Sequence, residues 1–201
     1  MAAEGNGSGM SDQRIGEALI REVIQEELRG SHSQNIPPLT PVQVTTMQER
    51  NMVDQLTKMV RIIGDRVKDD QELQDIIDGV AACPNSVTDR FREVANNVLQ
   101  EGISWEYISV LFYVAGKLAV KVVEAFLPNL VKDLLKCAVE FFRNNLLNWV
   151  REHGGWINSF SELAVASMQR VTRMNSHSCG LVLTFIAGLA IGGFISWRMT
   201  K

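Results

Sequence analysis

The sequence predicts an all-α protein in which amphipathic helices surround a central hydrophobic helical hairpin, followed by one apolar helix at the C-terminal end. Three observations lead to this fold class. Apolar residues recur at spacings of three and four through nearly the whole chain, which is the period of an α-helix. Residues 104–127 are apolar on nearly every face, which is typical of a helix at the centre of a bundle or of a membrane segment. Residues 179–197 form an uncharged apolar run that is long enough to span a bilayer.

Composition excludes several classes of function. The chain has 201 residues, a net charge of −3 and no long block of like charge, which is not typical of a nucleic-acid-binding surface. Its three cysteines, Cys83, Cys137 and Cys179, are widely spaced, which fits reduced thiols rather than a disulfide framework or a metal site. The three histidines are equally scattered, and the sequence has no phosphate-binding loop, nucleophile elbow or pair of catalytic carboxylates. We therefore predict no enzymatic activity, no cofactor and no metal.

The first helix is predicted over residues 11–28, with Gly30 as a typical helix stop. Its apolar face carries Ile15, Leu19, Val23 and Ile24. Residues 1–10 are rich in glycine and serine, so we expect them to be disordered. Residues 30–46 hold three of the five prolines and little charge, which predicts a long flexible surface loop.

The second helix, predicted over residues 47–68, carries the most informative segment of the chain. One continuous apolar stripe at helical spacing contains Leu56, Val60, Ile63 and Val67. A glycine inside a helix costs about 1 kcal/mol relative to alanine, so Gly64 predicts a close approach by a neighbouring side chain. Four apolar anchors beside Gly64 and Asp65 also suit a helix that binds in a hydrophobic groove, although an ordinary core helix has the same periodicity.

Two shorter helices are predicted next, over residues 71–82 and 86–100. Ser86 and Asp89 resemble a capping pair for the second of them, and Gly102 follows its end. Each helix has one apolar face, so both are expected to pack on the outside of the central hairpin.

The central hairpin is predicted from residue 104 onward. Ser104 is expected to cap a helix that runs to Leu127, and Pro128 is expected to begin its partner. The apolar side of that partner carries Leu130, Leu134, Leu135, Val139, Phe142 and Leu146. An apolar hairpin wrapped by amphipathic helices is the architecture expected of a protein that opens and places the hairpin on a bilayer.

The apolar run at residues 179–197 predicts a membrane anchor. Its 19 residues would form a helix about 28 Å long, which matches the hydrocarbon thickness of a bilayer. Gly188 and Gly192 form a pair of small residues that lets two such helices approach closely, and Arg198 and Lys201 close the run. A helix buried in the core of the domain is the alternative interpretation.

These segments together resemble the Bcl-2 (B-cell lymphoma two) family of apoptosis regulators, over about residues 12–201. The sequence Ile-Gly-Asp at 63–65 matches the core of the third homology motif (BH3), and the four anchors of that motif fall on the apolar stripe. Residues 149–156 resemble the second motif, which includes Trp149, Gly154, Gly155 and Trp156. Residues 16–28 are similar to the first helix of the family, which carries its fourth motif. The hairpin, with Lys117, Lys121 and Pro128, is more similar to that of the pore-forming members than to that of the survival proteins.

One position departs from the family pattern. The first homology motif normally reads Asn-Trp-Gly-Arg, whereas this chain has Ser104, Trp105, Glu106 and Tyr107. In the family the arginine pairs with the aspartate of a bound BH3 helix, and a tyrosine cannot form that ion pair. Arg90, Arg92 or a hydrogen bond from Tyr107 would have to replace it, or the groove would select different helices.

The resemblance implies a Bcl-like helical bundle over residues 11–168 and a C-terminal transmembrane helix. It implies a pro-apoptotic effector that oligomerises through its BH3 helix and groove and permeabilises the mitochondrial outer membrane, in the cytoplasm and at that membrane. The expected partners are BH3 proteins, Bcl-like survival proteins, further copies of the chain and lipid, but not nucleic acid. The alternative is a survival protein that sequesters BH3 helices without forming pores; a third interpretation is a tail-anchored scaffold with an unrelated helical domain. The hairpin and the intact Ile-Gly-Asp favour the effector.

Overall fold

The computed structural model describes residues 5–31, 36–40, 44–83, 86–100, 102–159 and 162. Its elements in chain order are α1 (Gly5–Gly30), α2 (Met47–Val67), α3 (Gln71–Ala81), α4 (Val87–Gln100), α5 (Trp105–Glu124), α6 (Asn129–Phe141), the π-helical turn η2 (Phe142–Leu146) and α7 (Leu147–Glu152). The described ranges contain no β-strand, so the predicted all-α class is confirmed.

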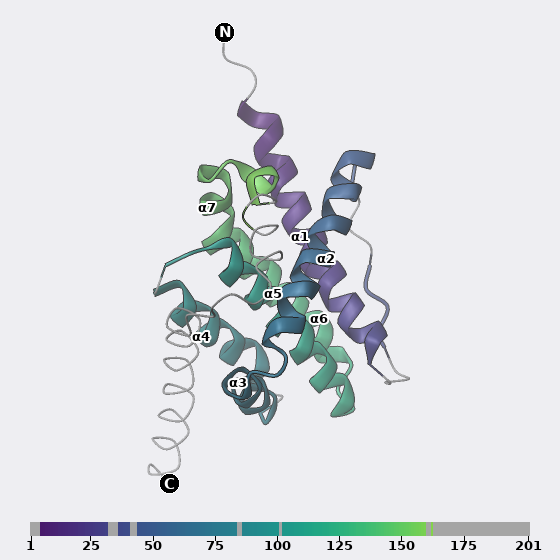
Figure 1. Cartoon of the computed structure of the whole chain (residues 1–201). Helices are drawn as coiled ribbons and strands as arrows, with labels where there is room; N and C mark the ends of the chain where they lie inside the picture. Colours follow the sequence, from purple (N-terminus) through teal and green to yellow (C-terminus); the bar gives the residue numbers. More distant parts are fainter. Residues whose placement is uncertain are drawn as a thin grey trace.

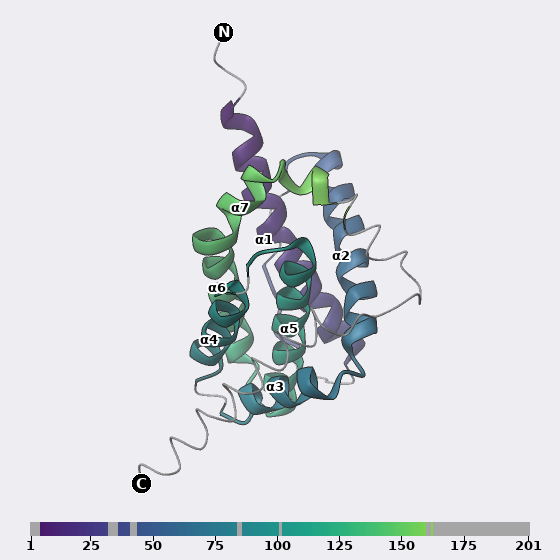
Figure 2. The same ribbon diagram turned by 60° about the vertical axis from the view of Figure 1, so that its left-hand side comes forward.

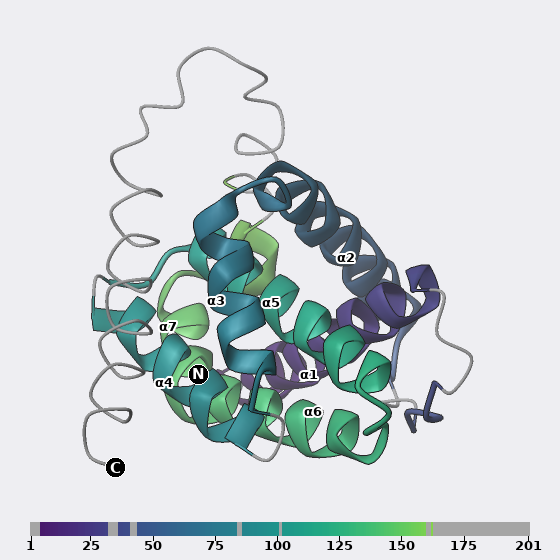
Figure 3. The same ribbon diagram turned by 90° about the horizontal axis from the view of Figure 1, so that it is seen from below.

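Helix α5 lies at the centre of the bundle and contacts α1, α2, α3, α4 and α6 (Figure 1). In Figure 2 it stands between α2 on one side and α4 and α6 on the other, with α3 across one end. The view along the bundle in Figure 3 again places α5 inside the other helices. Because α5 is apolar on nearly every face, this central position removes the largest apolar area from water.

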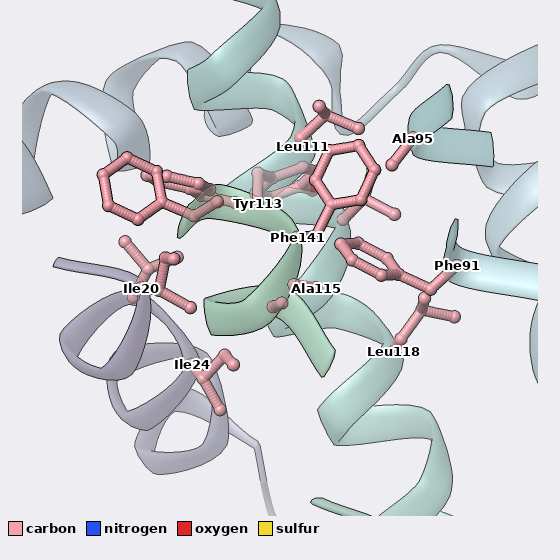
Figure 4. Close-up of a cluster of buried hydrophobic side chains, with 14 of the residues drawn as sticks. Ile20, Ile24, Phe91, Ala95, Leu111, Tyr113, Ala115, Leu118 and Phe141 are labelled. Atoms are coloured by element: carbon pink, nitrogen blue, oxygen red, sulfur yellow. The ribbon is translucent and has the colours of Figure 1, made fainter. Parts of the chain in front are cut away.

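The hydrophobic core is built on α5. Figure 4 shows Leu111 and Leu118 of α5 among side chains of α1, α4 and α6. The neighbours labelled in that view are Ile20 and Ile24 of α1, Phe91 and Ala95 of α4, and Phe141 of α6. All of them are at least 94% buried. At about 1.5–3 kcal/mol for each large apolar side chain, this cluster contributes much of the stability that holds α1 and α4 on the hairpin.

Three helices begin at side-chain caps. Ser104 accepts the backbone N–H of Tyr107 at the start of α5, as its position in the sequence predicts. Asp70 caps α3, and Thr46 caps α2 through a reciprocal pair of hydrogen bonds with Glu49. These caps satisfy backbone donors that the first turn of each helix leaves unpaired, and they fix where the helices start.

Three local features differ from the sequence-based expectations. Helix α1 begins at Gly5 rather than at residue 11, since extending an existing helix adds one hydrogen bond for each residue ordered. Helix α5 ends at Glu124 rather than at residue 127, because Phe126 adopts a left-handed backbone with φ of 61°. The hydroxyl of Ser86 donates to the carbonyl of Cys83 at 3.2 Å, and its pairing with Asp89 as a helix cap stays a prediction. The helix after Pro128 contains a π-helical turn, where the amide of Asn145 donates to the carbonyl of Phe141 at 3.0 Å.

The predicted anchor at 179–197 lies outside the described residues, as do residues 1–4 and parts of the predicted loop at 30–46. Of that loop the structure describes residues 30–31, 36–40 and 44–46, and all of these except Gly30, the last residue of α1, are non-helical. Within the described ranges, no helix combines the length and the apolar character needed to cross a membrane.

Candidate functional site

The BH3-like stripe of α2 faces the inside of the bundle. Leu56, Val60 and Ile63 are at least 98% buried, and Val67 at the end of the helix is half-buried. Helix α2 contacts α1 and α5, so the stripe is covered by these two helices. Asp65, two residues beyond Ile63, is exposed. The predicted anchors Leu56, Val60 and Ile63 therefore act here as core residues, and in this structure they are inaccessible to another molecule.

Gly64 lies where α2 comes closest to α5. A Cβ atom at this position would overlap the ring of Tyr113 and would lie 2.6 Å from its Cε2 atom. Tyr113 is itself 97% buried, so its ring has little room to move. The close approach that the mid-helix glycine predicts is therefore confirmed, and Tyr113 is the neighbour that causes it.

Beneath α2, an ion pair joins α1 to α5. The Nζ atom of Lys117 lies 2.7 Å from a carboxylate oxygen of Glu27 and 5.2 Å from the centre of the Tyr113 ring. Burial alone would lower the pKa of Lys117, but Glu27 outweighs it and raises that pKa. Burial raises the pKa of Tyr113, and Lys117 offsets part of that rise. Both groups are therefore fixed in their usual protonation states, Lys117 charged and Tyr113 neutral.

A cavity of about 610 Å³ opens beside this ion pair, between α1, α2 and α5. Its lining includes Glu27, Val60, Arg61, Asp65 and Lys117. Charges of both signs line it, which leaves no dominant field to select a cation or an anion. The surface of α1 and α5 beside α2 is therefore partly polar.

The first homology motif keeps its tryptophan in the core. Trp105 is 98% buried and packs edge-to-face on Trp149, with ring centres 5.0 Å apart. Tyr107 is half-buried at the edge of the core. Arg90 donates to the carbonyl of Gly79 at 3.0 Å. Arg92 pairs with Asp89 at 3.3 Å and Glu140 at 3.4 Å. Both arginines thus have partners on the folded bundle, and their suggested role in place of the motif arginine stays a prediction.

The second homology motif closes one end of the bundle. Gly154 and Gly155 have φ of 84° and 72°, a left-handed conformation in which glycine is strongly favoured. A Cβ atom on Gly155 would lie 2.7 Å from a carboxylate oxygen of Asp12, so only glycine lets α1 approach here. Trp156, which follows, is 99% buried, and its ring centre is 5.4 Å from that of Trp105. The structure thus brings the first and second motifs together around their tryptophans.

Asp12 was not anticipated as a functional residue. One oxygen of its carboxylate accepts the backbone N–H of Trp156 at 3.2 Å, and its backbone carbonyl accepts the indole N–H of Trp156 at 2.8 Å. Burial raises the pKa of Asp12, although the hydrogen bond from Trp156 and the charge of Arg151 partly oppose the rise. The partners lie 144 residues apart, so no local pattern in the sequence could have revealed this contact.

Glu49 was missed as well, although a signal for it exists. Its carboxylate accepts hydrogen bonds from two side chains of α1, Ser11 Oγ at 2.7 Å and Arg14 Nη2 at 2.9 Å. It also accepts hydrogen bonds from the backbone N–H groups of Thr45 and Thr46. Burial alone would raise the pKa of Glu49, but the bonds from Arg14, Ser11 and Thr45 outweigh it and lower that pKa. The spacing Thr46-x-x-Glu49 is that of a capping box, which would have identified the residue.

The remaining predicted site residues are positioned as follows. In the hairpin, Lys121 pairs with Asp78 of α3 at 2.9 Å, and Pro128 precedes the first residue of α6. Lys117 and Lys121 therefore hold the hairpin to α1 and α3 in the folded bundle. The anchor residues Gly188, Gly192, Arg198 and Lys201 lie outside the part of the chain that the structure describes.

Comparison with known sequences gives a consistent result. A model of the family described as apoptosis regulator proteins, Bcl-2 family, matches residues 44–156, which include α2 and both tryptophan motifs. Apoptosis regulator BAX from Bos taurus is 27% identical over 197 residues, covering 96% of this chain and 94% of its own length. Human Bcl-2-related ovarian killer protein (BOK) is 41% identical over 70 residues, covering 35% of this chain and 33% of its own length.

Comparison with solved structures shows the same fold. Chicken BOK matches with a TM-score of 0.62 and 24% identity, over 76% of this chain and 97% of that one. Human BOK matches with a TM-score of 0.59 and 25% identity, over 77% of this chain and 99% of that one. Trichoplax adhaerens trBcl-2L2, solved bound to trBak BH3, matches with a TM-score of 0.64 and 15% identity, over 78% of this chain and 99% of that one.

Proposed function

Because this chain belongs to the Bcl-2 family of apoptosis regulator proteins, we propose that it is a pro-apoptotic, Bax-like effector that permeabilises the mitochondrial outer membrane. In this proposal the chain acts by changing conformation and assembling, and it catalyses no reaction. Similarity to BAX over 96% of the chain and to BOK over part of it supports the effector branch of the family.

The observation that carries the proposal is the burial of the apolar stripe on α2. Leu56, Val60 and Ile63 together contribute about 4.5–9 kcal/mol to the resting form, at about 1.5–3 kcal/mol for each buried side chain. A second copy that offers an equivalent apolar groove recovers this free energy. Exchange of α2 between two copies therefore costs little overall once an activator has opened both.

The activator in this mechanism is a BH3 helix. It shifts the equilibrium only if it binds the open form more tightly than the resting form, because equal affinity for the two forms leaves their populations unchanged. The related Trichoplax protein was solved with such a helix bound. In this chain we assign the groove to the first and second motifs, with Trp105, Tyr107, Trp149, Gly154, Gly155 and Trp156.

The membrane-binding parts in the proposal are the hairpin and the tail. After the ion pairs of Lys117 and Lys121 break, α5 and α6 lie in the membrane interface with their apolar faces toward the lipid. The run at 179–197 anchors the chain, with Arg198 and Lys201 at the headgroups. The chain accordingly moves between cytoplasm and mitochondrial outer membrane, where survival proteins of the family, BH3 proteins and its own copies are its partners.

A dye-release assay tests the proposal. The purified full-length chain is added to liposomes of mitochondrial-like lipid, with and without an activating BH3 peptide. Peptide-dependent release is expected for an effector. Failure to release dye, together with suppression of the release caused by added BAX, would instead identify a survival protein that only sequesters BH3 helices. That second candidate keeps the same fold, groove and tail, and for this reason it is the alternative to test.

A further inference from the structure

A single turn of α1, Ser11–Arg14, holds two distant motifs at once. Ser11 and Arg14 both bind the carboxylate of Glu49, three residues beyond the N-cap of the BH3-bearing helix α2. Asp12, between them, binds the backbone N–H and, through its own carbonyl, the indole N–H of Trp156. The start of the BH3-bearing helix α2 and the end of the second homology motif are therefore joined through four consecutive residues.

We propose that the Ser11–Arg14 turn is an interlock, meaning that α2 and residues 153–159, which include the end of the second motif, stabilise each other on the bundle through it. Loss of either set of contacts then loosens the other segment. One consequence of the interlock depends on the proposed function: an activator that displaces one of the two segments also frees the other. The coupling itself is a property of the resting chain.

The residue types within the turn explain the coupling. Ser11, Asp12, Gln13 and Arg14 are all polar, and the buried apolar residues of α1 that follow them begin at Ile15. Polar contacts, rather than apolar burial, therefore hold these four residues on the bundle. The turn lies in the N-terminal third of α1 (Gly5–Gly30), and a helical segment opens locally more often when the tertiary contacts that hold it are lost.

Burial makes these contacts strong enough to matter. Asp12 and Glu49 are each 93% buried, and Trp156 is 99% buried. Hydrogen bonds of a buried carboxylate are more favourable than those of an exposed one, and removing one partner leaves the other unpaired. Displacement of Glu49 thus leaves Ser11 and Arg14 without their acceptor, while Asp12 remains the main attachment of the turn.

Hydrogen exchange measured by mass spectrometry on the full chain, without membranes, tests the interlock. Glu49→Gln removes the ion pair to α1, and Asp12→Ala removes the acceptor for the Trp156 backbone. Glu49→Gln is expected to speed amide exchange at residues 45–50, and Asp12→Ala at residues 153–159. Each variant should also speed exchange at the other variant's segment, by about threefold or more. In the double variant the increase should be smaller than the product of the two single increases, since one loss already frays the turn.

The matched control is Lys121→Gln. It removes an ion pair of equal length, 2.9 Å, between α5 and α3, away from the turn, and it should change exchange at neither segment. If Glu49→Gln impairs folding by circular dichroism, Arg14→Gln replaces it, because the Arg14 side chain is 36% exposed and its loss is milder. Effects of Glu49→Gln and Asp12→Ala that stay within their own segments would overturn the interlock. Because no membrane is present, that result would leave the proposed pore-forming function untouched.

Discussion

At the scale of single residues, Asp12 and Glu49 show how similar carboxylates acquire different roles. Both are buried where α1 meets another part of the chain. Glu49 receives an arginine and several hydrogen bonds, which stabilise its charged form. The carboxylate of Asp12 accepts one backbone N–H and is attracted by the charge of Arg151, and together these do not outweigh the cost of burial. The environment therefore stabilises one negative charge and destabilises the other.

The two carboxylates should therefore affect stability with opposite dependence on pH. For Glu49, whose folded pKa lies below the ordinary 4.5, the stabilisation is present above pH 4.5 and is lost as pH falls through the lowered pKa. For Asp12, whose folded pKa lies above the ordinary 3.8, the favourable contribution is present below pH 3.8 and is lost as pH rises through the raised pKa.

Urea unfolding at several pH values measures both contributions. At neutral pH Glu49→Gln should lower the free energy of unfolding by about 1–3 kcal/mol, and the difference from the wild type should shrink below pH 4.5. Asp12→Asn keeps the acceptor but removes the charge, so it should raise stability at neutral pH and have no effect below pH 3.8. If both variants changed the free energy of unfolding in the same direction at neutral pH, the opposite pKa shifts of Glu49 and Asp12 would be contradicted.

Gly64 provides the second prediction at this scale. Gly64→Ala should lower the free energy of unfolding by about 1–3 kcal/mol, because the methyl group overlaps the buried ring of Tyr113. Gly79→Ala is the matched control, since a Cβ atom there meets no heavy atom within 4 Å. That variant should gain about 0.5–1 kcal/mol from helix propensity alone. Thermal or urea unfolding of both variants measures these changes in the free energy of unfolding. A stabilising Gly64→Ala would refute the close contact with Tyr113.

At the scale of elements, the sequence is most informative where a pattern is local. The apolar stripe predicts the buried face of α2, and the serine at 104 predicts the start of α5, because periodicity and capping depend on neighbouring residues. The end of α5 is not predicted, since no glycine marks the left-handed position at Phe126. The π-helical turn is missed for a similar reason: Asn145 bonds back to Phe141 without any recognised sequence signature.

The turn between α5 and α6 gives a testable prediction about how these two helices are connected. Phe126 is 86% exposed and has a φ of 61°, so its ring contributes little packing while its Cβ atom strains the backbone. Phe126→Gly should raise the free energy of unfolding by about 0.5–1 kcal/mol. Phe126→Ala retains a Cβ atom and should give no such gain. A loss of stability in the glycine variant, seen in thermal unfolding, would show that Phe126 packs in a way its exposure does not indicate.

At the scale of the whole molecule, the bundle joins segments that are far apart in the chain. Its fold class and central helix follow from composition and periodicity, because a helix that is apolar all round must be covered by others. The attachments of α1 do not follow, since Asp12 meets Trp156 and Arg14 meets Glu49 only in the folded chain. The candidate site was thus predictable in its motifs but not in the polar contacts that hold those motifs at rest.

The central claim is that α2 leaves the bundle and binds a second copy. Its most direct test compares the wild type, Gly64→Glu and Gly79→Glu in peptide-triggered dye release from liposomes, at a temperature where circular dichroism shows all three to be folded. A glutamate at Gly64 blocks docking of the exchanged helix, whereas the same residue at Gly79 lies in open space. We predict release by the wild type and Gly79→Glu and none by Gly64→Glu. Release by Gly64→Glu equal to that of the wild type would contradict helix exchange as the basis of function.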